Sequence, residues 1–235
     1  MNMKTKKKLV FSTGAGVSAE SGISTFRDSG GLWEQYPVME VASADGFRRN
    51  PELVHRFYNA RRQQLVKTLP NEAHRIIASL EKDFDVRVIT QNVDDLHERA
   101  GSANVLHLHG ELMKLRSVEH PDYTETLSPP HLDSSPATIG KNGDHMRPHI
   151  VFFQEAVPNI EPAMQLAAEA DIFVVIGTSL NVYPAAGLIN CVRPHIPIYY
   201  IDPNPAPIPA SLSVNIIPLT ATEGMRKRAE ALRGC

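Results

Sequence analysis

The chain has 235 residues, of which 42% are hydrophobic and 21% are charged. This length and composition allow a substantial core in one large domain, or in a core domain with a smaller lobe, and exclude an intrinsically disordered protein. The formal net charge of −2 gives no general attraction to nucleic acid, and the basic run at Lys4 and Lys6 to Lys8 is interpreted as a solvated tail.

The cysteines and the apolar runs bear on the cellular compartment. The two cysteines, Cys191 and Cys235, form no CxxC pair, which suits a reducing compartment and offers no disulfide framework. No apolar run approaches the ~18 residues that a membrane span needs, and the N-terminus has no apolar stretch before a small-residue cleavage site. We expect a cytoplasmic protein with no membrane or nucleic-acid partner; its oligomeric state is not predicted.

Apolar runs rich in β-branched residues predict strands buried on both faces, at 8–12, 86–90, 172–176, 196–201 and 214–217. Helical patterns lie between them. The pattern at 71–80 opens on an Asn71 cap, the one at 162–168 has Pro162 at its first helical position, and a third spans 225–232. Strands that alternate with helices predict an α/β fold with a Rossmann-like, doubly wound parallel sheet.

Two stretches interrupt this alternation. Residues 38–70 look helical and contain no strand, and residues 113–147 are polar and irregular, with several prolines. We interpret them as two insertions that form a smaller lobe, the second partly mobile. The expected division is a Rossmann-like domain of residues 1–37, 81–112 and 148–235 and a lobe of residues 38–80 and 113–147, with the substrate cleft between them.

The first strand leads into Gly14-Ala15-Gly16-Val17-Ser18-Ala19, which fits the phosphate-binding pattern G-x-G-x-x-A. Such glycines permit a tight turn and close approach of the backbone to a pyrophosphate, with a helix N-terminus behind it. A dehydrogenase of this fold should carry an acid about 20 residues further on, at the end of a second strand. Glu34 is in range but follows a glycine-rich loop, so a dehydrogenase is disfavoured.

Extended to Arg27, the loop reads GAGVSAESGISTFR, and Gly30-Gly31-Leu32-Trp33 follows. This stretch resembles the signature of the sirtuins, the NAD-dependent protein deacylases. Further segments match in order: Thr90-Gln91-Asn92-Val93-Asp94, His107-Leu108-His109-Gly110-Glu111, Arg147-Pro148-His149-Ile150-Val151-Phe152-Phe153 and Gly177-Thr178-Ser179-Leu180. The resemblance covers about residues 8–112 and 147–222, and it implies a Rossmann-like domain with a small lobe.

The resemblance also implies roles for individual residues. Those expected near the pyrophosphate are Gly14, Ala15, Gly16 and Ser18. Those expected in the loop over the nicotinamide ribose are Glu20, Thr25, Phe26, Arg27 and Trp33. The nicotinamide pocket would be lined by Gln91, Asn92 and Asp94. The distal part of NAD would be held by Gly177, Thr178 and Ser179, and its adenosine half by Asp202, Pro203, Asn204 and Ala221.

The implied chemistry suits these residue types. The bond from ribose to nicotinamide breaks while the acyl-amide oxygen attacks, through an oxocarbenium-like transition state that depends on positioning and exclusion of water. Asp94 and Asn92 would hold the carboxamide in a strained pose. His109 would then deprotonate a ribose hydroxyl, because the pKa of histidine lies near physiological pH. The product would be an acylated ADP-ribose.

Structural roles remain open for several of these residues. His109 could be a hydrogen-bonded core histidine, and Trp33 could fill the core. Asp94 and Asp95 could cap a helix, and for Asp95 we prefer that role. We expect Glu111 to be structural. His97 and His107 are expected to pack or bond locally.

The chain departs from the sirtuin pattern in two places. The family usually carries two CxxC pairs that bind a structural zinc, whereas residues 110–147 hold no cysteine. The remaining candidate ligands lack tight metal-ligand spacing, so we predict no metal, and a lobe held by packing alone or loose: His120, His131, His145, Asp122, Asp133 and Asp144. Gln154 stands where the family commonly has glycine, in the segment expected to bind the substrate backbone through Val151, Phe152 and Phe153.

Tyr58 and Arg61 are three residues apart on a predicted helix, so they share a face. No acid stands three or four residues from Arg61, which therefore lacks an obvious local ion pair. The pair resembles the Tyr-x-x-Arg of sirtuins that accept succinyl and malonyl lysine, where the two residues bind the acyl carboxylate. The alternative is that Tyr58 packs and Arg61 is solvated.

The leading hypothesis is therefore an NAD-dependent deacylase that takes acetyl, succinyl and malonyl groups from lysines of protein or peptide substrates. A protein ADP-ribosyltransferase would share the nicotinamide cleavage step, but His109 favours deacylation. A non-catalytic NAD-binding module is disfavoured by the intact set of His109, Asn92 and Asp94.

Overall fold

The protein is described by a computed structural model that covers residues 5–23, 36–209 and 212–233. The strands are β1 (Lys8–Thr13), β2 (Asp85–Thr90), β3 (Val105–His107), β4 (Gly110–Ser117), β5 (Thr124–Thr126), β6 (Met146–Ile150), β7 (Ile172–Ile176), β8 (Ile198–Ile201) and β9 (Val214–Ile217). The α-helices are α1 (Gly16–Ala19), α3 (Val38–Val41), α4 (Ala44–Arg49), α5 (Pro51–Leu65), α6 (Glu72–Ser79), α7 (Leu96–Arg99), α8 (Ile160–Ala168) and α9 (Ala221–Arg233), with 3₁₀ turns η1 (Leu80–Lys82) and η2 (Ala185–Cys191).

A six-stranded sheet in the order β3-β2-β1-β7-β8-β9 forms the large domain, and all of its pairings are parallel. Its central strands are the predicted apolar runs, and the predicted Rossmann-like α/β fold is confirmed. The edge strand β3 was not predicted, because its three residues are too few to produce a periodic pattern.

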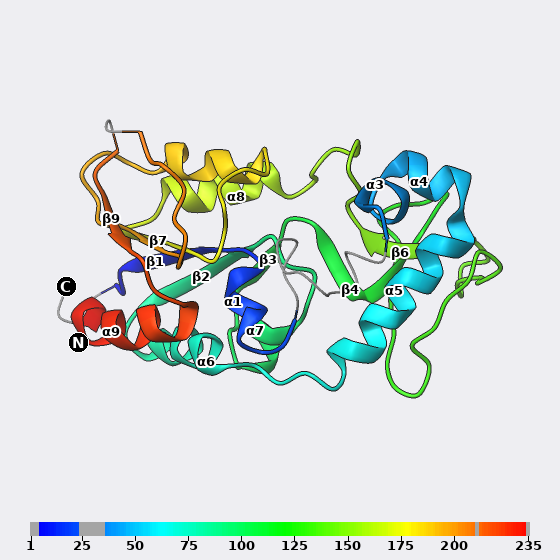
Figure 1. The fold of residues 1–235 in the computed structure, drawn as a ribbon, viewed down its shortest axis with the longest axis horizontal. Helices are drawn as coiled ribbons and strands as arrows, with labels where there is room; N and C mark the ends of the chain where they lie inside the picture. The colour runs from blue at the N-terminus through cyan, green and yellow to red at the C-terminus, as the bar shows by residue number, and fades with distance from the viewer. Residues whose placement is uncertain (1–4, 24–35, 210–211, 234–235) are drawn as a thin grey trace.

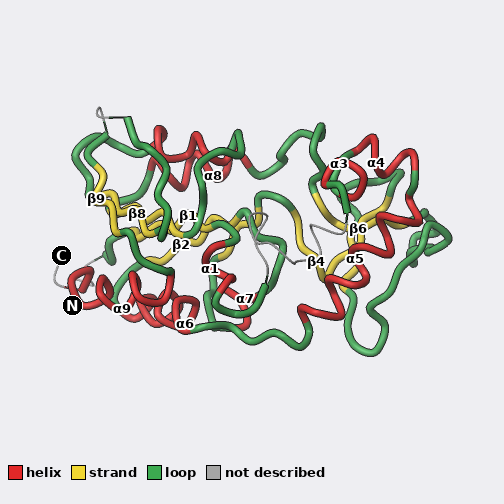
Figure 2. Tube along the Cα trace, viewed as in Figure 1, coloured by secondary structure: helices red, strands yellow, loops and turns green. Residues whose placement is uncertain are grey.

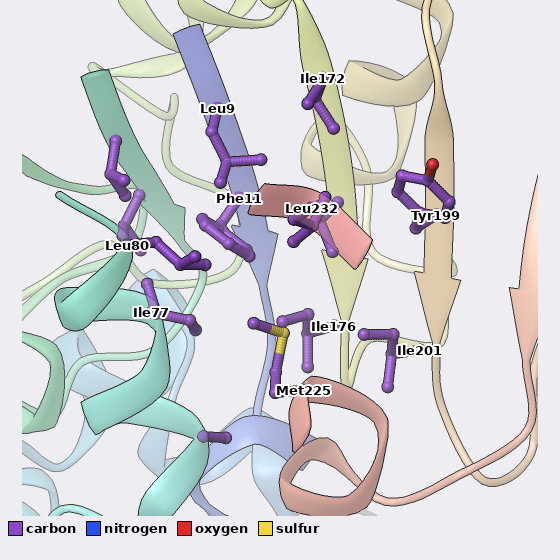
Figure 3. Packing of buried hydrophobic residues seen from close by; sticks show 14 of the residues in the cluster. Leu9, Phe11, Ile77, Leu80, Ile172, Ile176, Tyr199, Ile201, Met225 and Leu232 are labelled. Atoms are coloured by element: carbon purple, nitrogen blue, oxygen red, sulfur yellow. The ribbon is translucent and has the colours of Figure 1, made fainter. Parts of the chain in front are cut away.

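Both faces of the sheet are covered, which explains why β7 and β8 are apolar and buried along their whole length. Figure 2 shows the strands running between α8 on one side and α6 with α9 on the other. Phe11, Ile176 and Ile201 pack with Met225 of α9 and Ile77 of α6 (Figure 3). Alternate residues of the same strands pack against α8 and η2 on the opposite face.

The helix boundaries follow local signals with one exception. Asn71 caps α6 as predicted, its side chain accepting hydrogen bonds from the amides of Ala73 and His74. The prediction that Pro162 occupies the first helical position is wrong, because α8 begins at Ile160 and Pro162 is its third residue. Its missing N–H still costs no helical hydrogen bond, because it lies within the first turn. Within the described ranges, no helix has the length and apolar character of a membrane span.

The smaller lobe lies at one end of the molecule (Figure 1). Helices α3, α4 and α5 confirm the predicted helical insertion. The interpretation of 113–147 as irregular is wrong in part, because β4, β5 and β6 form an antiparallel sheet in the order β5-β4-β6. The exact domain borders stay a prediction, and α6 favours a shift: Ala73 and Ile77 pack against the large sheet rather than in the lobe.

Hydrogen bonds supplement packing in the lobe. Asn59 of α5 accepts from Arg62 at 2.7 Å and from the Ser134 amide at 3.1 Å, and its own amide donates to Ser134 O at 2.9 Å. Further along the chain, Asp144 accepts from Ser117 at 2.5 Å and from His120 at 2.7 Å. The first bonds join α5 to the segment at Ser134, and the second bonds join residues 117–120 to Asp144. Packing is therefore not the lobe's only support.

We expect the purified protein to hold no stoichiometric zinc and to keep its melting temperature in a strong chelator. Among the residues that the structure describes, no group of three or more His, Cys, Asp or Glu side chains could hold a metal ion. A structural zinc contributes folding free energy, so its removal unfolds the region that it holds. Elemental analysis that finds one zinc per chain, lost on chelation together with the lobe's structure, would contradict this prediction.

Candidate active site

The candidate site lies at the carboxyl edge of the large sheet. Thr13, Thr90, His107, Ile176 and Ile201 form one row across five strands. Most of the predicted catalytic and cofactor-binding residues follow this row by one to five positions, in the segments 14–18, 91–94, 108–109, 177–179 and 202–204. Since parallel strands end at a common edge, motifs far apart in the sequence meet there. Helices α1 and α7 lie beside this edge, on the side of the sheet that α6 and α9 cover (Figure 1).

Gly14 and Gly16 bring the phosphate-binding loop against the end of β7. Their amides donate to Ile176 O at 3.0 Å and Gly177 O at 2.8 Å. A Cβ atom on Gly16 would lie 2.6 Å from Gly177 Cα, and Gly177 itself has φ +61°. Both glycine amides are thus used within the protein, so these glycines are required first for contact between two loops. Their role at a pyrophosphate stays a prediction.

We expect Gly16→Ala to lower the melting temperature. Overpacking of a close contact costs about 1–3 kcal/mol, and each kcal/mol shifts the melting temperature of a chain of this size by roughly 2–4 °C. Gly187→Ala is the matched control, because a Cβ there would meet only Tyr183 Cε1, at 3.9 Å. Calorimetry of the three proteins checks the prediction, and equal melting temperatures for both variants would contradict it.

A hydrogen-bonded chain links the first two motifs. Asn92 Nδ2 donates to Ser18 Oγ at 3.1 Å, and the Ser18 hydroxyl donates to Asp94 Oδ2 at 3.0 Å. The other Asp94 oxygen accepts from the Leu96 amide at 3.2 Å. Burial raises the pKa of Asp94, while these hydrogen bonds and the charge of His107 lower it. The structure thus brings together Ser18, Asn92 and Asp94 as a buried polar group.

His109 approaches the same loop from the other side. Its Nδ1 lies 3.0 Å from Gln91 O. Since a carbonyl oxygen only accepts, Nδ1 carries the proton and the Nε2 lone pair is left to act as a base. Burial lowers the pKa of His109, only partly offset by this hydrogen bond. His109 is therefore neutral at physiological pH, the state that a general base requires.

The distal motif is joined to the pocket by Gln91, whose Nε2 donates to Thr178 Oγ1 at 3.1 Å. Tyr200 OH in turn donates to Thr178 O at 2.8 Å. Asp202 Oδ1 is occupied by the Asn204 amide at 2.8 Å. These bonds fix the loops after β7 and β8. Contacts of Ser179, Pro203 and Ala221 with a nucleotide stay a prediction.

Glu20 takes a position that the sequence did not suggest. Its carboxylate accepts from the Thr222 amide at 2.8 Å and from Thr220 Oγ1 at 3.2 Å, at the N-terminus of α9. An acid there complements the helix dipole, so Glu20 has a structural task besides its expected place near the ribose. The expected flexible-loop residues lie outside the described residues: Thr25, Phe26, Arg27 and Trp33.

The expected peptide-binding segment is held by the lobe. Phe153 donates its amide to Ala42 O at 2.8 Å and accepts from the Ala44 amide at 3.1 Å. Phe152 is buried in the lobe core, whereas the side chain of Phe153 is exposed. Val151 donates its amide to His109 O at 3.0 Å, which links this segment directly to the candidate base. The substrate contacts expected of these residues stay a prediction.

Gln154 has φ +77°, which explains why glycine suits this position and shows that glutamine tolerates it here. Its side chain donates to Asp45 Oδ2 at 2.7 Å and accepts from the Asp45 amide at 3.1 Å. The glutamine therefore ties the segment to the N-terminus of α4.

Tyr58 and Arg61 share one face of α5, as predicted. Tyr58 is buried against Phe152, with 6.0 Å between ring centroids, and burial raises its pKa to about 12. The Arg61 guanidinium carbon lies 5.8 Å from the Tyr58 ring centroid. Burial lowers the pKa of Arg61, and the charge of Asp94 acts in the opposite direction, which places Arg61 within electrostatic reach of the candidate pocket.

Asp95, His97 and His107 were expected to have structural roles. Asp95 precedes α7 but caps nothing with its side chain; Asp94 performs that task through the Leu96 amide. His97 and His107 bond locally as expected, His97 to Thr13 at 3.1 Å and His107 to Glu98 at 2.7 Å. The sequence did not reveal the His107–Glu98 pair, because the two residues lie on different elements, β3 and α7, and only packing brings them together.

The fold and this edge define a class: an enzyme domain that binds a nucleotide at the switch point of a parallel sheet. Its buried polar group of Ser18, Asn92 and Asp94 lies at this edge, and the neutral His109 contacts the same loop. A family model described as the Sir2 family matches residues 14–184. The chain belongs to the Sir2 family, and the predicted resemblance is confirmed.

Relatives and solved structures agree with this assignment. The chain is 52% identical over 229 residues to an NAD-dependent protein deacylase of Bacteroides thetaiotaomicron, covering 96% of this chain and 98% of the relative. It is 51% identical over 197 residues to an NAD-dependent protein deacylase of Helicobacter pylori, covering 84% and 85%. A crystal structure of a Sir2 homologue in complex with NAD superposes with a TM-score of 0.85 at 38% identity, covering 97% of this chain and 90% of that one.

Proposed function

We propose that the chain is an NAD-dependent protein-lysine deacylase that releases nicotinamide and forms an acyl-ADP-ribose. The observation that carries this proposal is the meeting of the Ser18–Asn92–Asp94 chain with the neutral base His109 at one sheet edge. The names of the deacylase relatives support the same activity.

The residues fit the nicotinamide end of NAD. A primary carboxamide offers N–H donors and a carbonyl acceptor, which a carboxylate and a side-chain amide complement. Asp94 and Asn92 supply this pair and are 6% and 7% exposed. NAD, when bound, supplies a ribose carbon whose bond to nicotinamide can break. The pocket's task is to orient the carboxamide and exclude water.

His109 then has one task. With NAD and the acyl substrate bound, its Nε2 lone pair would take the proton of a ribose hydroxyl and so make that oxygen a nucleophile toward the carbon of the acyl group. The lowered pKa keeps this nitrogen unprotonated below the ordinary range of histidine. We therefore infer that activity persists as the pH falls toward the ordinary pKa of about 6.5 and is lost further below it.

The finer proposal concerns the acyl group. We infer that Tyr58 and Arg61 accept succinyl and malonyl lysine besides acetyl lysine. The raised pKa keeps the Tyr58 phenol protonated, so that it can donate a hydrogen bond, and arginine keeps its charge in proteins. Together they suit an acyl carboxylate.

The proposed location of the protein is the cytoplasm.

Mass spectrometry of acyl-lysine peptides incubated with NAD tests the function. Acetyl, succinyl and malonyl peptides of one sequence are compared. We expect loss of the acyl group together with free nicotinamide and acyl-ADP-ribose. Transfer of ADP-ribose to the peptide would instead indicate an ADP-ribosyltransferase. NAD binding without turnover of any peptide would indicate a non-catalytic module.

A further inference from the structure

Two histidines of adjacent segments contact neighbouring carbonyls of one loop. His107 Nδ1 lies 2.9 Å from Asn92 O, and His109 Nδ1 lies 3.0 Å from Gln91 O. Because carbonyl oxygens only accept, both rings carry a proton on Nδ1. The two side chains therefore differ in the environment and protonation of Nε2.

At Nε2 their environments are opposite. His107 Nε2 lies 2.7 Å from Glu98 Oε1, and the His107 side chain is 7% exposed. A carboxylate accepts only, so this nitrogen is protonated as well, and the ring is an imidazolium. Burial opposes this charge, but Glu98 outweighs it and the pKa of His107 lies above its ordinary value, while that of His109 lies below. When the surroundings of two residues of the same type push their pKa values apart in this way, the two residues can perform different functions.

The His107 imidazolium acts on the carboxamide pocket by two routes. Its hydrogen bond holds the Asn92 carbonyl, and the Asn92 side chain begins the chain through Ser18 to Asp94. Burial raises the pKa of Asp94 overall, and the charge of His107 acts against this rise. Both routes favour an oriented amide beside an ionised carboxylate.

We propose that the Glu98–His107 ion pair is a positioning element of the nicotinamide pocket, and that it makes NAD affinity fall as the solution becomes alkaline. This inference rests on the proposed function in that NAD is the ligand of the pocket. Neither residue contacts the reacting atoms in this scheme; His107 acts through Asn92 and Asp94.

The surrounding charges support the direction of this pH dependence. Glu98 and His97 face His107 from α7, Glu111 from β4 and Asp94 from the pocket loop, while Lys114 of β4 acts on Glu98. Glu98 and Glu111 both raise the pKa of His107. The ion pair is therefore complete at lower pH and is lost as the pH rises through the folded-state pKa of His107. The protonation of His109 affects only the acidic side.

The test is Glu98→Gln in the full chain, which keeps shape and a hydrogen-bonding partner but removes the negative charge. Calorimetry measures NAD affinity from about pH 6 to about pH 9, across which a histidine of raised pKa loses its proton. At the acidic end we expect about 5- to 10-fold weaker binding than in the parent, the low end of couplings between distinct sites. The parent's alkaline loss of affinity should shift to lower pH in the variant.

His107→Asn is the second variant. Asparagine can still donate toward Asn92 O but carries no charge, so it should reproduce the effect of Glu98→Gln, and the double variant should add little to either. His120→Asn is the matched control, because it removes the exposed histidine of another carboxylate pair, His120–Asp144, on the lobe. It should leave NAD affinity unchanged at every pH.

Equal NAD affinity of the parent and Glu98→Gln across the range would overturn the inference. So would a proton-resonance titration in which the His107 ring, assigned by its absence from His107→Asn, is neutral near pH 6.5, the ordinary histidine value. Circular dichroism identifies variants that fail to fold, and the parent titration then decides alone. If the parent binds NAD with this pH dependence but removes no acyl group, only the proposed deacylation fails.

Discussion

His109→Ala should leave NAD affinity within a few fold of the parent and depress turnover by roughly 10²–10⁴-fold, the usual cost of losing a general base. The reason is geometric: the ring reaches the loop through Nδ1 and Gln91 O, which leaves Nε2 for chemistry. Initial rates of nicotinamide release from a fixed acyl peptide, with calorimetric NAD binding beside them, check both halves of the prediction.

An exposed histidine of the lobe provides the control. His131→Ala removes an exposed imidazole distant in sequence from the site motifs and should retain the parent rate. Deacylation by His109→Ala near the parent rate would contradict the base assignment. Loss of folding and NAD binding together would mean that His109 is a core histidine after all.

Arg61→Met should slow removal of succinyl groups by roughly 10–100-fold in kcat/KM and leave removal of acetyl groups little changed. A charge-assisted hydrogen bond is worth about 1.5–3 kcal/mol, and each 1.4 kcal/mol is about tenfold. Acetyl carries no carboxylate, so it has nothing to lose. Methionine keeps much of the side chain's apolar length beside Phe57 and Tyr58.

Tyr58→Phe is the companion variant, because it removes only the hydroxyl from a ring that stays packed against Phe152. Like Arg61→Met, it should slow removal of succinyl groups more than removal of acetyl groups, but by a smaller factor. Arg56→Met, on an exposed position of the same helix, is the matched control and should change neither rate. Equal losses on acetyl and succinyl substrates would assign Arg61 a structural role.

The residue pattern alone predicted much of the large domain. Runs such as 172–176 are apolar along their whole length because both faces of a parallel strand are covered. Such continuous runs can be recognised in the sequence alone. The family resemblance assigned the segments after β1, β2 and β7 to one NAD site, and the structure places them together because the carboxyl ends of these parallel strands share one edge. The lobe's strands were missed because β5 is short and polar, and because β4 and β6 mix polar and apolar residues without clear alternation.

What only the tertiary structure decided is how individual polar atoms are paired. The protonated nitrogen of His109 follows from a carbonyl 18 residues away, and the charge of His107 from Glu98 on another element. Glu20 meets α9 across 202 residues of sequence, and Gln154 meets Asp45 across 109. Sequence periodicity reports which side chains are buried, because burial depends on the faces of regular elements. It does not report which donor meets which acceptor, because that depends on distances and angles that exist only after the elements have packed.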